Sequence, residues 1–310
     1  MSRDKKNIIS HLYLIIICVL CLFHGTVLAT DTIFLDTTPS SKQLQALHLL
    51  KKKSDLTQSK FWPNVHPIPF LQNLKKNIEA PLSLYEGNST NFCGYAALSY
   101  LPLHDDPLSY LRFMLQLYIE GSAQYSRENF DPSIAVKLTA GTLSFKGELD
   151  VNPADQLWFL ALADHFKGYV NFLDHHYDPG NENTMWASVN FSKFNRMIRK
   201  LFNYHVKAVG SDLMRPNVRD EFEYLSKKIK TGTIALFVNN LDLYKKNHSK
   251  VKMIVPTHYV ILLDIRKVED KIAITYWDYG GKTLQMVSPK FLKRILFGIT
   301  YITPKKIDVE

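Results

Sequence analysis

Cysteine is scarce in this chain of 310 residues, which has only Cys18, Cys21 and Cys93. The first two lie in an N-terminal segment that we expect to be removed, so Cys93 would be the only thiol of the mature chain and could form no intramolecular disulfide. An unpaired thiol in an oxidising compartment is a liability unless it is buried or used. The question is therefore whether Cys93 is a buried hydrophobe or a nucleophile.

Long hydrophobic runs are also missing. The apolar run at residues 12–23 contains twelve residues, whereas a membrane-spanning helix needs about 20. Three basic residues precede this run, and Val27-Leu28-Ala29 follows it as a possible cleavage point. This pattern predicts a secretory signal at residues 1–29, with an uncleaved membrane anchor as the alternative. We therefore expect a secreted or periplasmic protein that meets the membrane only through this segment during export.

The sequence has no low-complexity tract, no internal repeat and no massed block of positive charge. Residues 1–29 carry three cations and one acid, so the net charge of +9 falls to +7 on cleavage (9 − 3 + 1). Since the lysines are scattered, we expect no nucleic-acid partner and a charge that serves solubility. Residues 244–252 form a basic loop before a predicted strand. An anionic substrate would explain this loop, although a solvated loop is the simpler interpretation.

The predicted domains are a signal at 1–29, an N-terminal extension or pro-segment at 30–80, and a catalytic domain at 81–305. Within the extension, residues 42–53 have helical spacing. Residues 61–88 contain four prolines, which we interpret as an extended approach to Cys93.

The remaining chain changes character near Gly232. Before it the patterns predict mostly helices, and after it they predict strands rich in β-branched and aromatic residues. This order indicates an α+β domain. The predicted helices are 107–120, 153–165, 192–204 and 219–230, and the predicted strands are 232–240, 258–265, 271–278, 283–287 and 298–303.

Cys93 lies at the expected start of a short helix. Thr90 and Asn91 are good N-cap residues, which would place Cys93 at the first or second helical position. The positive end of the helix dipole favours a thiolate there, and Gly94 leaves room beside the sulfur. The alternative is a small buried cysteine that only fills space.

A thiolate nucleophile needs a base, and the base needs an orienting group. Eleven histidines are present, but His258 starts a strand that is apolar on both faces and is therefore central in a sheet. If the next hairpin centres on Val268, His258 lies directly opposite Asp278, close enough for a hydrogen bond. A slip of one residue would remove this alignment. The alternative is that Asp278 only caps a turn.

The segments "NFCGYAAL", "HYVILLDI" and "ITYWDYGG" together resemble the papain-like cysteine peptidases, in particular the C39-like branch. In that family a cysteine begins a helix, a histidine follows on one strand, and an Asp or Asn ends the next strand. The resemblance covers residues 89–101 and 232–303. It implies a helical lobe packed against a mostly antiparallel β-sheet, with no metal and no cofactor.

The resemblance further implies catalytic roles for Cys93, His258 and Asp278 in cleaving peptide or other amide bonds through a thioester. The family usually has a glutamine six positions before the cysteine as the oxyanion donor, and here that position is Gly87. Asn88 and Asn91 are the candidate replacements. Two alternatives remain open: a transglutaminase-like acyltransferase, and a catalytically weak secreted binding module on the same scaffold.

Overall fold

The computed structural model describes residues 39–167, 179–239, 243 and 256–305. The predicted signal at 1–29 and the basic loop at 244–252 lie outside the described residues. The described residues from Ser40 to Lys305 belong to one compact unit. Among the described residues, no helix is both long and apolar enough to cross a membrane.

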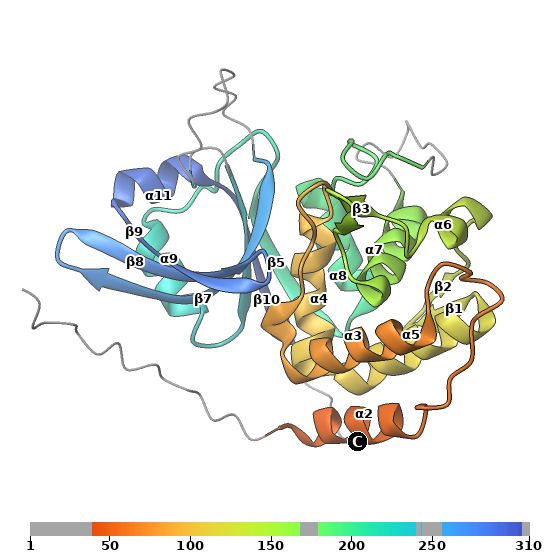
Figure 1. Cartoon of the computed structure of the whole chain (residues 1–310). Coiled ribbons are helices and arrows are strands. Elements are labelled where there is room, and N and C mark those ends of the chain that lie inside the picture. Colours follow the sequence, from red (N-terminus) through yellow and green to blue (C-terminus); the bar gives the residue numbers. More distant parts are fainter. Residues whose placement is uncertain (1–38, 168–178, 240–242, 244–255, 306–310) are drawn as a thin grey trace, which may run out of the picture. The chain divides into compact units, whose positions relative to one another are not determined.

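The fold is α+β, as the sequence predicts (Figure 1). Its helices belong mostly to the first two thirds of the chain. In the described part they span Ser41–Lys51 (α2), Pro67–Glu79 (α3), Cys93–Asp105 (α4), Pro107–Glu120 (α5), Ile134–Thr139 (α6), Pro153–Phe166 (α7), Phe191–Leu201 (α8), Glu221–Lys228 (α9) and Pro289–Ile295 (α11), with a 3-10 turn at Pro81–Ser83 (η1).

A six-stranded sheet forms the other half of the unit, and all of its neighbouring strands are antiparallel. The strand order is β5-β10-β6-β7-β8-β9, so β7 is central, as its two apolar faces predict. The strands span Tyr204–Gly210 (β5), Thr233–Val238 (β6), His258–Val268 (β7), Lys271–Asp278 (β8), Gly281–Val287 (β9) and Leu296–Pro304 (β10). Two small hairpins add Ala123–Tyr125 (β1) with Glu128–Phe130 (β2), and Ser144–Phe145 (β3) with Glu148–Leu149 (β4).

Hydrophobic cores lie on both faces of the sheet. The larger core joins helices α2 to α8 to one face through residues such as Trp158, Tyr259 and Trp277. The smaller core packs α9 and α11 against the other face, with Leu225 and Leu292 fully buried. Helix α4 contacts β7 directly, and Figure 1 shows α4 (yellow-orange) as the helix beside the sheet. The N-terminus of α4 therefore comes close to the start of β7.

The prediction of an extended approach at 61–88 is wrong over much of its length, because α3 occupies Pro67–Glu79. Proline is tolerated in the first helical turn, where its missing N–H leaves no hydrogen bond unmade. Pro67 and Pro69 both lie in that turn, and Phe70 and Leu74 point into the larger core. Helix α2 packs on α3 and α5, and α3 packs on α7. The segment from residue 40 to 80 thus shares the core of the following chain.

The predicted region of helices before residue 230 also contains strand β5, which follows α8 after a short turn. Helix α8 ends at Leu201, and Tyr204 already belongs to the strand. The alternating exposure along β5 shows why its short apolar pattern was difficult to distinguish from a helix end.

The register between β7 and β8 also differs from the prediction. The chain turns at residues 269–270, where Glu269 has a φ of 54°, rather than at Val268. Near this turn the paired residue numbers sum to 539, as in Val268↔Lys271, whereas beyond a bulge at Leu263 they sum to 538, as in Ile261↔Trp277. The expected sum of 536 is therefore wrong by two at the site end of the hairpin.

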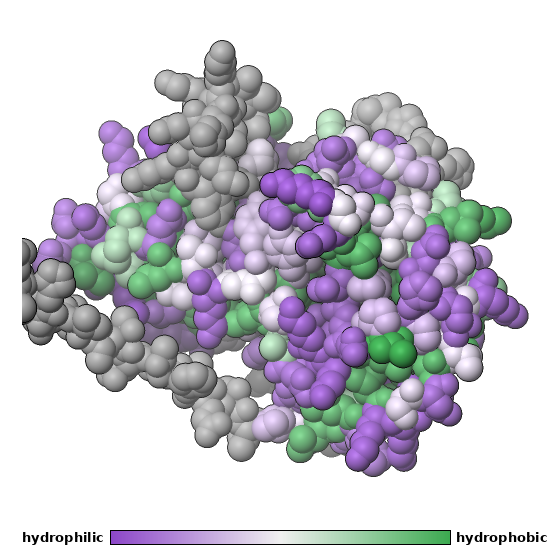
Figure 2. Space-filling model, viewed as in Figure 1, coloured by the Kyte–Doolittle hydropathy of each residue, from purple (hydrophilic) through white to green (hydrophobic). Residues whose placement is uncertain are grey.

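The surface in Figure 2 is a mosaic of hydrophilic and hydrophobic residues, in which the green areas form small separate patches. The exposed large hydrophobic side chains are distributed in the same way, over several helices and strands. They include Leu44, Ile68, Ile134, Leu213 and Leu284. Scattered apolar residues of this kind are normal on a folded protein and mark no binding face by themselves.

Candidate active site

Cys93 is the first residue of α4, which confirms the predicted helical position. The predicted N-cap residues are wrong, however, because Phe92 occupies the N-cap and makes no side-chain cap bond. Thr90 instead donates its hydroxyl hydrogen to the Glu86 carbonyl oxygen at 2.5 Å and accepts a bond from Phe92 N–H at 3.4 Å. The chain from Glu86 to Cys93 is thus tied into a compact turn before the helix.

The first N–H groups of any helix have no carbonyl partner within it. Of the α4 groups, the Gly94 N–H opposes the rise in the thiol pKa only weakly, because burial of the sulfur has the largest effect. Gly94 also has no room for a side chain: an added Cβ would lie 2.7 Å from Val189 Cβ and 3.3 Å from Tyr259 Cδ2. This close packing brings the start of α4 against the first residues of β7.

His258 is 2% exposed, and its Nε2 lies 2.5 Å from Asp278 Oδ1. The bulge in β7 explains how this contact survives the altered register. Extended by one pair, the local sum of 538 places Asp278 opposite Val260, so His258 is the diagonal neighbour of Asp278, two positions away on the same face. The aromatic ring of Tyr279 stacks on the imidazole with ring centroids 5.0 Å apart and an angle of 13°. The imidazole is therefore held by a hydrogen bond and a stacked ring.

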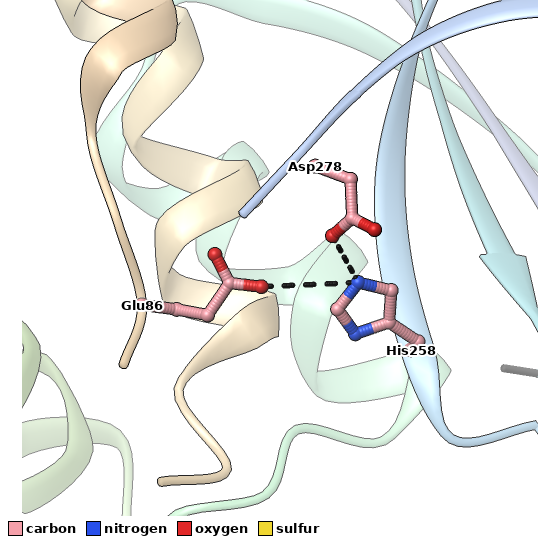
Figure 3. A group of neighbouring side chains, drawn as sticks. All are labelled: Glu86, His258 and Asp278. Carbon is pink, nitrogen blue, oxygen red and sulfur yellow. Dashed lines mark hydrogen bonds and ion pairs between the residues drawn. The ribbon is translucent and has the colours of Figure 1, made fainter. Parts of the chain in front are cut away.

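Figure 3 shows the orientation of this imidazole. The nitrogen that contacts Asp278 is Nε2, and the second ring nitrogen, Nδ1, lies on the other side of the ring. When Nε2 carries the proton that it donates to Asp278, Nδ1 is the unprotonated nitrogen of the neutral imidazole.

A cavity of about 220 Å³ is lined by two of the three predicted catalytic residues, and Asp278 is not part of its lining. Cys93 and His258 both line it, and the Cys93 Sγ lies 3.9 Å from the carbonyl oxygen of Thr257, the residue before His258. The complete lining is Glu86, Thr90, Asn91, Cys93, Thr257, His258 and Tyr279. Cys93 as a residue is half-buried, but its sulfur is the part that is removed from solvent.

The two candidate oxyanion donors occupy different positions. Asn91 lines the cavity, and its Nδ2 donates to the Thr184 carbonyl oxygen at 3.1 Å. Asn88 is exposed and is not among the described residues that line the cavity. Its backbone N–H donates to Asp150 Oδ1 at 2.7 Å, which fixes the loop rather than the side chain.

Sequence reasoning missed Glu86, which lines the same cavity and is 2% exposed. Its Oε1 lies 3.8 Å from His258 Nε2 (Figure 3). Neither carboxyl oxygen makes a short hydrogen bond to a described side chain, although the backbone N–H groups of Glu86 and Tyr279 lower its pKa in part. A single acid seven positions before the cysteine carries no sequence signal. The following Gly87 is the one local hint of an unusual turn, because glycine adopts positive φ without strain, and its φ in the structure is 91°.

The pKa values of the acids in this cluster are raised. Burial and, secondly, the charge of Asp278 raise the pKa of Glu86 to about 8. Burial raises the pKa of Asp278 to about 7, while the Tyr279 N–H lowers it in part. Of the two, Asp278 has the short contact to imidazole, so we assign the negative charge to Asp278 and the proton to Glu86 at neutral pH.

The pKa of the Cys93 thiol is raised, whereas the helix dipole alone predicts that it is lowered. Burial, followed by the charge of Glu86, raises the pKa of Cys93 to about 12, although N–H groups of Tyr259 and Gly94 lower it in part. Desolvation therefore outweighs the dipole, and the resting site holds a neutral thiol. Such a thiol needs a base to take its proton when it attacks.

Glu86, His258 and Asp278 also offer ligand atoms that lie within 4.8 Å of one another, a grouping that could suit a metal ion. Two ligand atoms at about 2.1 Å from one ion and at right angles to it lie about 3 Å apart. The distance of 2.5 Å between His258 Nε2 and Asp278 Oδ1 is shorter than that and fits a shared proton. The two groups would have to separate before one ion could bind both.

A scan of the chain against protein-family models finds no match, and a search of curated proteins finds no similar sequence.

Proposed function

We propose that this protein is an exported cysteine hydrolase of papain-like type that cleaves peptide or other amide bonds. Cys93 is the nucleophile, His258 the general base and acid, and Asp278 the residue that orients the ring. The single observation that supports this proposal is the cavity of about 220 Å³ that Cys93 and the Asp278-bound imidazole line together.

The proposed reaction starts from the neutral thiol. His258 Nδ1 takes the thiol proton while Cys93 Sγ forms a bond to the substrate carbonyl carbon, and the carbonyl electron pair moves to oxygen. The imidazolium is stabilised by Asp278 through the Nε2–H hydrogen bond. Collapse of the tetrahedral adduct breaks the carbon–nitrogen bond, and the amine leaves with the proton from Nδ1. Water then hydrolyses the thioester with His258 again as base.

Iodoacetamide labelling tests the first step. After signal removal Cys93 is the only cysteine of the chain, so all labelling reports on this thiol. We expect alkylation at pH 7 in the wild type and a rate about 10²-fold lower in His258→Ala, because the base that accepts the thiol proton is gone. Equal rates in both proteins would contradict the assignment of His258 as the base.

Hydrolysis is tested with a library of blocked peptides whose new N-termini are detected by mass spectrometry. Wild type should produce new N-termini, and Cys93→Ala should produce none. The same incubation with an added primary amine distinguishes hydrolysis from acyl transfer. Amine-linked products in place of new termini would favour the transglutaminase-like acyltransferase.

A second candidate is a secreted binding module with little or no catalysis. The raised pKa of Cys93, to about 12, favours it, because a fully protonated thiol is a poor nucleophile without effective base catalysis. Under this alternative Cys93→Ala would retain the full biological effect of the wild type.

A further inference from the structure

Glu86 is a buried acid that the proposed triad does not use. It comes from the loop before α4, lines the cavity with Cys93, and is 2% exposed. Its carboxyl oxygens make no short hydrogen bond to the described side chains, and only the backbone N–H groups of Glu86 and Tyr279 act on them, lowering the pKa in part. A carboxyl group buried with so little hydrogen bonding costs free energy, and such a position is often functional.

Glu86 faces the cavity because the next residue, Gly87, has no space for a side chain. The papain-like pattern has its oxyanion-donating side chain six positions before the cysteine, where this chain has Gly87. No side chain fits at Gly87, since a Cβ there would lie 2.7 Å from Val151 Cγ2 and 2.8 Å from Asp150 Oδ2. Asp150 also accepts bonds from the next two backbone N–H groups, at 2.7 Å each. The loop therefore turns so that the residue one position earlier, Glu86, faces the cavity.

The protonation state of Glu86 follows from its surroundings. Burial and the Asp278 charge both favour the neutral acid, and its pKa is about 8. Asp278 holds the nearer contact to His258 Nε2, at 2.5 Å against 3.8 Å for Glu86. The titratable groups that surround Glu86 are Tyr85, Cys93, Asp150, His258, Asp278 and Tyr279.

We propose that Glu86 in its acid form donates its O–H to the oxyanion that develops when Cys93 attacks a carbonyl carbon, together with the backbone N–H of Cys93. This inference rests on the proposed hydrolase function. A neutral carboxylic acid supplies one strong donor, as the glutamine amide does in the family pattern. No proton is transferred: when the adduct collapses, the carbonyl double bond forms again and the Glu86 hydrogen bond weakens.

Two probes separate this role from the role of His258. Acylation by p-nitrophenyl acetate passes through an oxyanion and releases p-nitrophenolate, whereas alkylation by iodoacetamide displaces iodide and forms no oxyanion. Both are measured at pH 6.5, where the wild-type Glu86 is neutral and its replacement changes no charge. The variants are Glu86→Gln, Glu86→Ala and Cys93→Ala, with Glu79→Gln as the matched control for an exposed acid on α3.

We expect Glu86→Ala to lose about 100-fold in acylation rate, which is the usual effect of removing one oxyanion donor, while its alkylation rate changes by less than about threefold. Glu86→Gln should keep the acylation rate within about tenfold of wild type, since its amide is also a donor. Wild-type acylation should decline above pH 8 as Glu86 ionises, and the decline should move to higher pH in Glu86→Gln. Glu79→Gln should match the wild type in both reactions.

Three results would overturn parts of this reasoning in distinguishable ways. Equal acylation by wild type and Cys93→Ala would refute the hydrolase function itself. Cys93-dependent acylation that is unchanged in Glu86→Ala would refute only the role of Glu86. Equal losses of acylation and alkylation in Glu86→Ala, with an unchanged circular dichroism spectrum, would show that Glu86 only positions Cys93 or His258.

Discussion

The raised pKa of Glu86 predicts that the free energy of unfolding falls as the pH rises. The substitution Glu86→Gln should remove this part of the pH dependence. In the unfolded chain a glutamate ionises near pH 4.5, whereas in the folded protein Glu86 keeps its proton to about pH 8. Above pH 4.5 the unfolded state therefore binds fewer protons at this site than the folded state does. The contribution is fully present below pH 4.5 and is lost as the pH rises to about 8.

The magnitude follows from the size of the shift. A change from 4.5 to about 8 corresponds to roughly 5 kcal/mol, at about 1.4 kcal/mol for each pKa unit. Asp278 competes for the same proton, so we expect about half of this, ~2–3 kcal/mol, to be measured at Glu86 alone. Glu86→Gln, which cannot ionise, should gain this amount over the wild type between pH 5 and pH 9.

Urea unfolding followed by tryptophan fluorescence measures the effect at both pH values. At pH 5 wild type and Glu86→Gln should differ little, and at pH 9 the variant should be the more stable protein. Glu79→Gln controls for the loss of an acid, because Glu79 is an exposed partner of Lys75. A stability difference between wild type and Glu86→Gln that stays constant from pH 5 to pH 9 would refute a neutral Glu86.

Two further predictions concern the loop and the triad. Gly87→Ala should lower the free energy of unfolding by about 2–4 kcal/mol, because the added Cβ is strained at a positive φ and clashes with Val151. Gly147→Ala is the control, because Gly147 has a similar φ of 87° but no atom within 4 Å of the added Cβ, and it should cost only ~1 kcal/mol. Equal losses of both variants in urea titrations would exclude the clash. Asp278→Ala should slow acylation of Cys93 by about 10²–10⁴-fold, because the imidazole loses the group that orients it. A rate within about threefold of wild type would contradict that role.

The sequence predicts much of the secondary structure because strong local signals mark it. Helix α5 has Asp106 as its N-cap and Pro107 in its first turn, and Gly121, with a φ of 75°, is its C-cap. All three features are standard boundary signals. Helix α3 was missed because its prolines were interpreted as loop residues, although the first turn tolerates them. The error lay in the position assigned to the prolines relative to the helix start.

The site is less predictable than the secondary structure, because its electrostatics depend on burial. The helix dipole at Cys93 predicts a thiolate, but burial of the sulfur and the nearby charge of Glu86 raise its pKa to about 12. Glu86 was missed for the same reason. An isolated glutamate in a loop is normally exposed, and only the fold shows it buried beside His258 and Asp278.

The contact between His258 and Asp278 shows how a predicted pair can form through a different register. In an antiparallel pair, the numbers of directly opposed residues add up to a constant, the register sum. Two side chains share a face of the sheet only if their own residue numbers add up to an even number when the register sum is even, or to an odd number when it is odd. Near the turn the register sum is 539, which would place His258 and Asp278 on opposite faces of the sheet. The bulge at Leu263 changes the sum to 538 and returns both side chains to one face. One unpaired residue, five positions from the histidine, therefore decides whether the imidazole reaches its carboxylate.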